Sequence, residues 1–269
     1  MPDTSGSPVL EVAGLRKEYG ELVAVDDVSF GLPPGRSLAI VGQSGSGKTT
    51  IARMIVGLER PSRGVITACG HDRSRPPRSA RDRRRRGREV QIVFQDPYTS
   101  LDPRQSAESA IDEVLRLHHR WPAERRWARV AELTTLVGLD ARQSRALPRS
   151  LSGGQRQRVA IARALAAQPA VLILDESVAS LDVSIQAQVL NLLADIRDQT
   201  RVSYVLISHD LAVVRQLTDE TLVLHRGTVV ERGPTARVLD DPQHPYTQRL
   251  RASVPRPGWR PRPLPHPRG

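Results

Sequence analysis

Short apolar runs bounded by turn residues recur along the chain and predict buried strands. The clearest runs occupy residues 9–12, 22–25, 38–41, 171–174 and 204–207. A further pair at 222–224 and 228–230 is joined through Arg226-Gly227 and predicts a hairpin. The run at 38–41 leads directly into a glycine-rich loop, as a buried parallel strand does.

Helical periodicity alternates with these strands. It follows Lys48 as far as Gly57 and returns in residues 110–118, 127–137, 156–167 and 185–196. We therefore expect an α/β fold in which residues 105–150 form a helical insertion between two halves of a sheet-containing core.

Composition and charge narrow the class of protein only slightly. With 269 residues, 39% of them apolar, the chain can bury a substantial core. The net charge of +11 suits nucleic acid or an anionic membrane surface equally well. Aromatic residues make up only 3%, which argues against a base-stacking surface. Lys17 and Lys48 are the only lysines, so a lysine at position 48 is notable in an arginine-rich chain.

Two segments are strongly biased. Residues 71–89 are basic and rich in proline, and we interpret them as a solvated surface segment, with docking to acidic lipid or a partner as the alternative. From Pro255 onward proline, arginine and glycine predict an extended, unpacked tail. Cys69 is the single cysteine, which excludes an internal disulfide and fits a reducing compartment. Residues 1–8 lack a signal-peptide core, and every apolar run is too short to span a bilayer, so membrane association would require a partner.

The first chemical motif is a glycine-rich loop of the form G-x-x-x-x-G-K-T. Its glycines allow backbone N–H groups and the following helix N-terminus to surround a polyphosphate. Lys48 would reach the β- and γ-phosphates, and Thr49 would bind Mg²⁺. A flexible linker would not explain Lys48-Thr49. The predicted nucleotide contacts are Gly42, Gln43, Ser44, Gly45, Ser46, Gly47, Lys48, Thr49 and Thr50.

The second motif is the apolar run 170–174, which ends in Asp175-Glu176. Successive side chains on a strand point in opposite directions, so the two carboxylates cannot share one role. Asp175 is expected to bind Mg²⁺ and Glu176 to polarise the attacking water. By itself, a strand that ends in solvated acids is also common.

The third motif is Leu-Ser-Gly-Gly-Gln at residues 151–155, a second glycine-rich phosphate contact. Ser152, Gly153, Gly154 and Gln155 open a helix whose N-terminus can face a phosphate. The chain's own loop already holds its own nucleotide. The simplest geometry is therefore a head-to-tail dimer in which each copy completes the site of the other. A simple helix cap is the alternative.

These motifs, in this order, resemble the ATP-binding-cassette (ABC) family over nearly the whole chain. The resemblance implies a P-loop NTPase ABC-type nucleotide-binding domain with an antiparallel β subdomain and a helical subdomain at about 96–160. It also implies that Tyr19 stacks on adenine, although a strand-end tyrosine is the alternative. Gln95 would touch Mg²⁺ and the water, and His209 would contact the γ-phosphate. Asp182 would lie in the loop that crosses the dimer interface. The family usually has proline after the glutamate, where this chain has Ser177, so the stiffness of this loop is in doubt.

Three further segments resemble the oligopeptide, dipeptide and nickel importer ATPases, namely residues 94–104, 182–193 and 244–250. The resemblance implies an ATP hydrolase with ATP and Mg²⁺ as cofactors, peripheral on the cytoplasmic face of the membrane. Its expected partners are two permeases, a sister or identical ATPase subunit and, indirectly, an extracytoplasmic solute-binding protein. The domain would span 1–254 with an importer-type segment at about 232–255, followed by the tail 255–269.

Two other classes remain as alternatives. A soluble ABC ATPase acting on nucleic acid or ribosomes would suit the positive charge. Such proteins usually carry two cassettes or a long coiled-coil insertion, and this chain has neither, so no nucleic-acid partner is expected. A P-loop GTPase or kinase is the third possibility, and it lacks a recognisable Asn-Lys-x-Asp motif.

Overall fold

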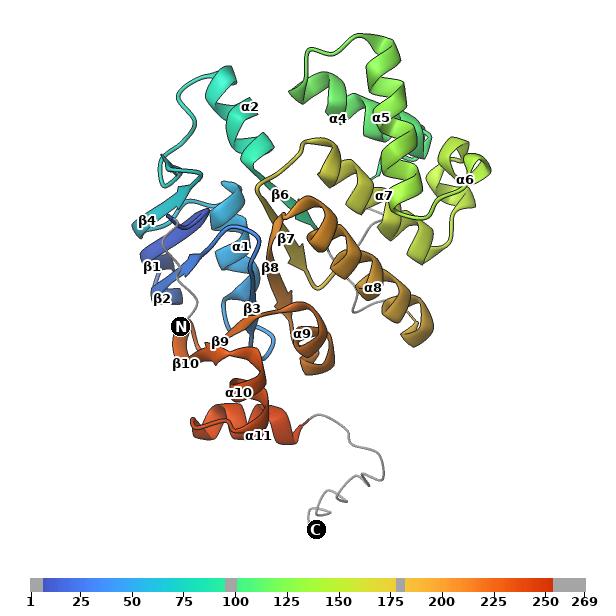
Figure 1. Ribbon diagram of the computed structural model, residues 1–269. Helices are drawn as coiled ribbons and strands as arrows, with labels where there is room; N and C mark the ends of the chain where they lie inside the picture. The colour runs from blue at the N-terminus through green and yellow to red at the C-terminus, as the bar shows by residue number, and fades with distance from the viewer. Residues whose placement is uncertain (1–6, 95–100, 178–181, 254–269) are drawn as a thin grey trace, which may run out of the picture.

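The computed structural model describes residues 7–94, 101–177 and 182–253, which form two sheets and the helices around them (Figure 1). The smaller sheet is antiparallel throughout, with strand order β2-β1-β4-β5. Its strands are β1 (Leu10–Tyr19), β2 (Leu22–Leu32), β4 (Arg63–Ala68) and β5 (His71–Asp72). The expected antiparallel sheet is thus present.

The larger sheet has strand order β10-β9-β3-β8-β7-β6, and only β10 runs antiparallel to its neighbour. All residues of β3, β7 and β8 are buried, as their continuous apolar runs require. The strands are β3 (Ser37–Val41), β6 (Val90–Val93), β7 (Val171–Asp175), β8 (Ser203–Ser208), β9 (Glu220–His225) and β10 (Thr228–Pro234).

The parallel register brings the candidate site together. Val41 pairs with Ser208, and Asp175 pairs with Ile207. The carboxyl ends of β3, β7 and β8 therefore meet at one edge of the sheet, where ligands bind in open α/β folds.

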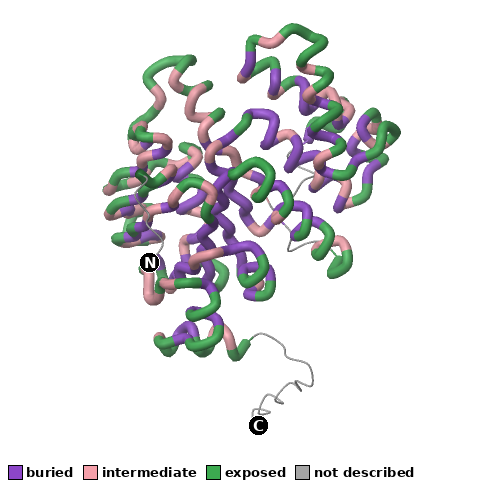
Figure 2. Tube along the Cα trace, viewed as in Figure 1, coloured by how far each residue is buried: buried purple, intermediate pink, exposed green. Residues whose placement is uncertain are grey.

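The helix α1 (Lys48–Val56) lies between the two sheets. Its residues Ile51 and Ile55 share one apolar core with Leu10 and Phe30 of the small sheet and Ile40 of the large one. A second core joins the other face of the large sheet to most of the remaining helices. Buried residues concentrate in the strands and in the helix faces turned toward them (Figure 2).

The helical region lies to one side of the large sheet (Figure 1). It contains α4 (Ala107–His118), α5 (Ala123–Leu136), α6 (Ala141–Arg145), the 3-10 turn Pro148–Ser150 and α7 (Gly153–Ala166). The helices at 110–118 and 127–137 were correctly expected but begin three and four residues earlier, at Ala107 and Ala123, whereas α7 begins at Gly153, where the motif at 151–155 predicted a helix start. For α4 the reason is capping, because the Ser106 side chain accepts the N–H of Ser109 ahead of the first apolar residue.

After β7 the chain forms α8 (Val183–Thr200) and α9 (Leu211–Leu217). Two short helices, α10 (Thr235–Asp240) and α11 (Pro245–Ala252), follow the hairpin of β9 and β10. They lie at the end of the molecule away from α4 and α5 (Figure 1). In the described part of the chain, no helix combines the length and apolarity needed to cross a membrane.

The structure corrects several sequence expectations. The strands expected at 9–12 and 22–25 extend to ten and eleven residues, because the backbones of β1 and β2 pair at polar positions as well as at apolar ones. The segment 71–89 contains β5 and the helix α2 (Ala80–Glu89), neither of which was expected, but apart from Arg73 none of its residues is buried, in agreement with its interpretation as a surface segment. The strands β4 and β6 and the helices α9, α10 and α11 were not expected. Gln95 and the tail 255–269 lie outside the described residues.

Candidate functional site

The glycine-rich loop turns sharply between β3 and α1. A Cβ atom on Gly42 would lie 2.3 Å from the carbonyl oxygen of Leu224, and one on Gly47 would lie 2.4 Å from that of Ala24. Gly47 also has a φ of 105°, in the left-handed region. The loop therefore wraps tightly against two neighbouring strands, and only glycine fits at these two positions.

Lys48 begins α1 and is only 5% exposed. Its Nζ atom donates to the carbonyl oxygens of Gly42 at 2.8 Å and Gln43 at 2.9 Å. The pKa of this ammonium is lowered, because the effect of burial outweighs that of the nearby Glu176 and Asp175 carboxylates, which raise it. The Ser46 hydroxyl, among the described residues, is buried without a hydrogen-bond partner. A loop with a desolvated ammonium and an unused hydroxyl fits a phosphate chain.

The first turn of α1 meets the end of β7 beside this loop. The Thr49 Oγ1 atom donates to the Asp175 Oδ1 atom over 3.3 Å. The pKa of Asp175 is raised, because the effect of burial outweighs that of the hydrogen bond from Thr49, which lowers it. A hydroxyl and a carboxylate are the hard oxygen ligands that Mg²⁺ takes together with waters and substrate phosphates. These two side chains therefore fit a Mg²⁺ ion.

Glu176 follows directly, with a φ of 46°, a left-handed conformation that is uncommon for residues other than glycine. Its N–H donates to the Ile207 carbonyl at 2.9 Å, and its Oε1 atom lies 3.3 Å from Nδ1 of His209. Asp175 thus faces Thr49 while Glu176 faces His209. The two adjacent carboxylates have different partners, as the sequence motif predicted.

The segment 151–155 has a different set of contacts. The Ser152 Oγ atom accepts the Gln155 N–H at 3.3 Å, and Gln155 Oε1 accepts the Ser152 N–H at 2.8 Å. Within one chain these residues form a capping box, which was the simpler interpretation of the motif. A Cβ atom on Gly154 would lie 2.4 Å from Cγ2 of Ile185, so the start of α7 is packed against the first turn of α8.

Two other expected residues lie at exposed positions. Tyr19 ends β1 with 44% of its surface exposed, and the Lys17 ammonium lies 4.6 Å from its ring centroid. Asp182 precedes α8 and makes no side-chain capping hydrogen bond. The structure therefore brings together the loop, Asp175, Glu176 and His209, whereas residues 152–155 contact each other and α8.

Sequence reasoning missed one residue at the loop. The Tyr246 Oη atom in α11 accepts the N–H of Gln43 at 3.0 Å, although the two residues are 203 positions apart. The segment 244–250 was singled out by its resemblance to importer ATPases, and that resemblance was the only available signal.

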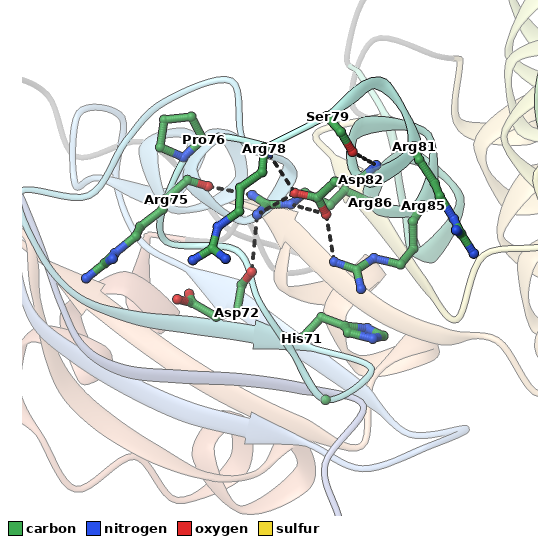
Figure 3. A pocket seen from close by; sticks show the side chains of 11 residues that line it. His71, Asp72, Arg75, Pro76, Arg78, Ser79, Arg81, Asp82, Arg85 and Arg86 are labelled. Carbon is green, nitrogen blue, oxygen red and sulfur yellow. Dashed lines mark hydrogen bonds and ion pairs between the residues drawn. The ribbon is translucent and has the colours of Figure 1, made fainter.

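A separate hollow of about 720 Å³ lies over α2 and the loop before it (Figure 3). Asp82 lies at its centre and accepts hydrogen bonds from the Arg78 N–H and from the Arg85 and Arg86 guanidinium groups. The backbone bond from Arg78 is the main cause that lowers the pKa of Asp82 to about 2. The arginine-rich segment is therefore partly an internal ion-pair network. The residues that line the hollow are Gly70, His71, Asp72, Arg75, Pro76, Arg78, Ser79, Arg81, Asp82, Arg85 and Arg86.

The chain is similar to known proteins in sequence and in structure. The chain is 41% identical over 260 residues to the dipeptide transport ATP-binding protein DppF of Haemophilus influenzae, covering 93% of this chain and 79% of that protein. It is 43% identical over 243 residues to the di/tripeptide transport ATP-binding protein DppF of Pseudomonas aeruginosa, covering 90% and 74%.

Among solved structures, the dimeric post-hydrolysis state of the ATP-binding cassette MJ0796 with ADP and Pi is similar, with a TM-score of 0.75 at 27% identity. The match covers 84% of this chain and 98% of that one. The family model of the ABC transporter matches residues 25–179, and that of the oligopeptide/dipeptide transporter C-terminal region matches residues 230–269. The chain therefore belongs to the ABC transporter family, as an ATP-binding subunit that carries the oligopeptide/dipeptide type of C-terminal region.

Proposed function

We propose that this chain binds and hydrolyses ATP to energise a peptide importer. The main support is a structural observation: one edge of the large sheet holds Lys48, the Thr49–Asp175 pair and the Glu176–His209 pair. The relatives that it matches over most of its length are named for dipeptide or di/tripeptide transport. The alternative, an ABC ATPase acting on nucleic acid or ribosomes, has no such support.

Each side chain has a role in this proposal. Lys48 and the loop N–H groups hold the β- and γ-phosphates, and Tyr19 stacks on the adenine. Thr49 and Asp175, together with Gln95, hold Mg²⁺, which supplies charge neutralisation when bound. Glu176 accepts a hydrogen bond from the attacking water or takes its proton. His209 holds the Glu176 carboxylate and contacts the γ-phosphate.

The site is completed by a second ATPase subunit, identical or sister. The N-terminus of α7 presents Ser152 and the N–H groups of Gly153 and Gly154 to the partner's nucleotide, because helix N-termini favour anions. Asp182 precedes α8 and lies at the same interface. The similar cassette MJ0796 is itself described as a dimer with ADP and Pi, which supports this arrangement.

The permease contact falls on the helical region. A hollow of about 510 Å³ lies between β6, α4 and α7, and Leu117 at its rim is 53% exposed. Its lining combines apolar side chains with Gln91, His118 and Arg163, a mixture that suits a cytoplasmic loop of a membrane permease. We propose further that the protein acts peripherally on the cytoplasmic face of the membrane, together with two permeases and an extracytoplasmic solute-binding protein. The domain extends over 1–254.

Reconstitution with the permeases tests this proposal. We expect the chain to co-purify with them and to drive ATP-dependent uptake of labelled di- or oligopeptides. Leu117→Arg should abolish permease binding while leaving ATP binding intact. Leu58→Arg is the matched control, because Leu58 is 64% exposed outside the hollow. Peptide uptake that is unaffected by Leu117→Arg would remove the docking assignment. Stable recovery with ribosomes or DNA, and with no permease, would favour the alternative.

A further inference from the structure

The C-terminal region reaches the phosphate-binding loop through one tyrosine. Tyr246 is 4% exposed, and its Oη atom accepts the N–H of Gln43 at 3.0 Å. This is a contact from α11, the last described helix, to the second residue of the loop. This hydrogen bond therefore links the C-terminal region directly to the loop that we propose binds phosphate.

The position of Tyr246 is set by the hairpin of β9 and β10. Its ring packs on that of His225 at the end of β9, with 3.9 Å between the centroids. The carboxylate of Glu231 in β10 accepts the N–H groups of Gln243 at 2.8 Å and His244 at 3.1 Å, just before α11 begins. The His244 ring then accepts the N–H of Tyr246 at 3.1 Å. The tyrosine is therefore held on the hairpin from both its ring and its backbone.

The Gly42–Gln43 peptide group is held on both of its polar atoms. Its N–H donates to Tyr246 Oη, and its carbonyl oxygen accepts from Lys48 Nζ at 2.8 Å. In a planar trans peptide these two groups point in opposite directions. Fixing the N–H from the side of α11 thus fixes the orientation of the carbonyl that holds the Lys48 ammonium.

The same hairpin contacts the loop at further points. The Gly227 N–H donates to the Ser46 carbonyl oxygen at 3.0 Å, and the Leu224 carbonyl oxygen occupies the space beside Gly42. Tyr246 adds a contact from α11, which follows the hairpin. A change in the position of α11 would therefore alter the hydrogen bond at Gln43, and through the same peptide group the position of the Lys48 ammonium.

We propose that Tyr246 is a positioning residue for the phosphate-binding loop, through which the oligopeptide-type C-terminal region sets the affinity for ATP. The inference rests on the proposed role of the loop in binding phosphate. Tyr246 does not touch the nucleotide in this scheme. It orients one peptide group, and that group orients the lysine.

Tyr246→Phe tests the inference, because it keeps the ring on His225 and removes only the acceptor oxygen. In the full-length protein, the Kd for Mg-ATP and the KM should rise about 3- to 10-fold, the equivalent of one hydrogen bond, while kcat stays within about twofold. Hydrogen exchange of the Gln43 amide, measured without nucleotide, should become faster. This second measurement does not depend on turnover.

Tyr204→Phe is the matched control. Tyr204 is fully buried in β8 and donates to the Leu193 carbonyl oxygen at 2.8 Å, away from the loop. It should lose a similar amount of stability without a change in ATP affinity or in Gln43 exchange. If Tyr246→Phe, like Tyr204→Phe, changes neither the affinity for ATP nor the exchange of the Gln43 amide, Tyr246 is only a packing residue and the inference is wrong. Lys48→Ala separates the two proposals, because retained ATP binding there would refute the phosphate role itself.

Discussion

The Nδ1 atom of His209 lies 3.3 Å from the Oε1 atom of Glu176, across the parallel pair β8 and β7. The backbone of Glu176 is in the left-handed region, and its carboxylate contacts His209 while that of Asp175 contacts Thr49. In the proposed function, water activation and metal binding would be divided between these two adjacent residues.

Glu176→Gln should abolish ATP turnover while leaving ATP binding intact. The amide keeps the shape and one hydrogen bond to His209 but cannot take a proton, a loss of about 10²–10⁴-fold in rate. The bound, unhydrolysed ATP should hold two subunits together as a closed dimer, visible by size-exclusion chromatography with Mg-ATP. Undiminished turnover by this variant would contradict the assignment of Glu176.

Gly154→Ala should destabilise the fold as well as disturb the composite site. The added methyl group would lie 2.4 Å from Cγ2 of Ile185, so α7 and α8 must separate, at a cost of about 1–3 kcal/mol. Gly154→Ala combined with Ile185→Ala removes the colliding atom and should recover part of that loss in urea unfolding. Equal instability of the single and double variants would show that the contact is not responsible.

The helical region should depend on one buried ion pair. Asp112 in α4 is 1% exposed, and it bonds to Arg126 of α5 at 2.8 Å and to Arg116 at 2.9 Å. Arg126→Ala leaves this carboxylate with a single, exposed partner and should cost about 2–4 kcal/mol. Arg116→Ala is the matched control and should cost below about 1 kcal/mol, because its side chain is 61% exposed. Equal losses for the two variants in urea unfolding would contradict this ranking.

Asp82 should stabilise the arginine-rich segment in a pH-dependent way. Its pKa falls from 3.8 to about 2 in the folded protein, so the unfolded chain binds the proton more readily. The stabilisation is therefore complete above about pH 4 and is lost as the pH falls through 2. The difference in unfolding free energy between wild type and Asp82→Asn should shrink over that window. A difference that is constant with pH would count against the ion-pair network.

Much of the site was predictable because the chemistry lies directly after buried strands. The apolar runs before Gly42, Glu176 and His209 predicted parallel strands, and the carboxyl ends of parallel strands meet at one edge. The start of α4 was less predictable, since Ser106 acts through capping rather than through periodicity. The longer strands of the small sheet were missed because half-exposed positions give no continuous apolar signal.

The sequence by itself determined the order of the motifs, the α/β class and the residue types at the proposed phosphate and metal positions. Only the tertiary structure decided that Tyr246 holds Gln43 and that Gly154 packs on Ile185. The contacts of Tyr246 and Gly154 join segments far apart in the chain, and each depends on how whole elements pack. Local patterns set which groups a segment carries, whereas burial of shared apolar faces sets which groups meet.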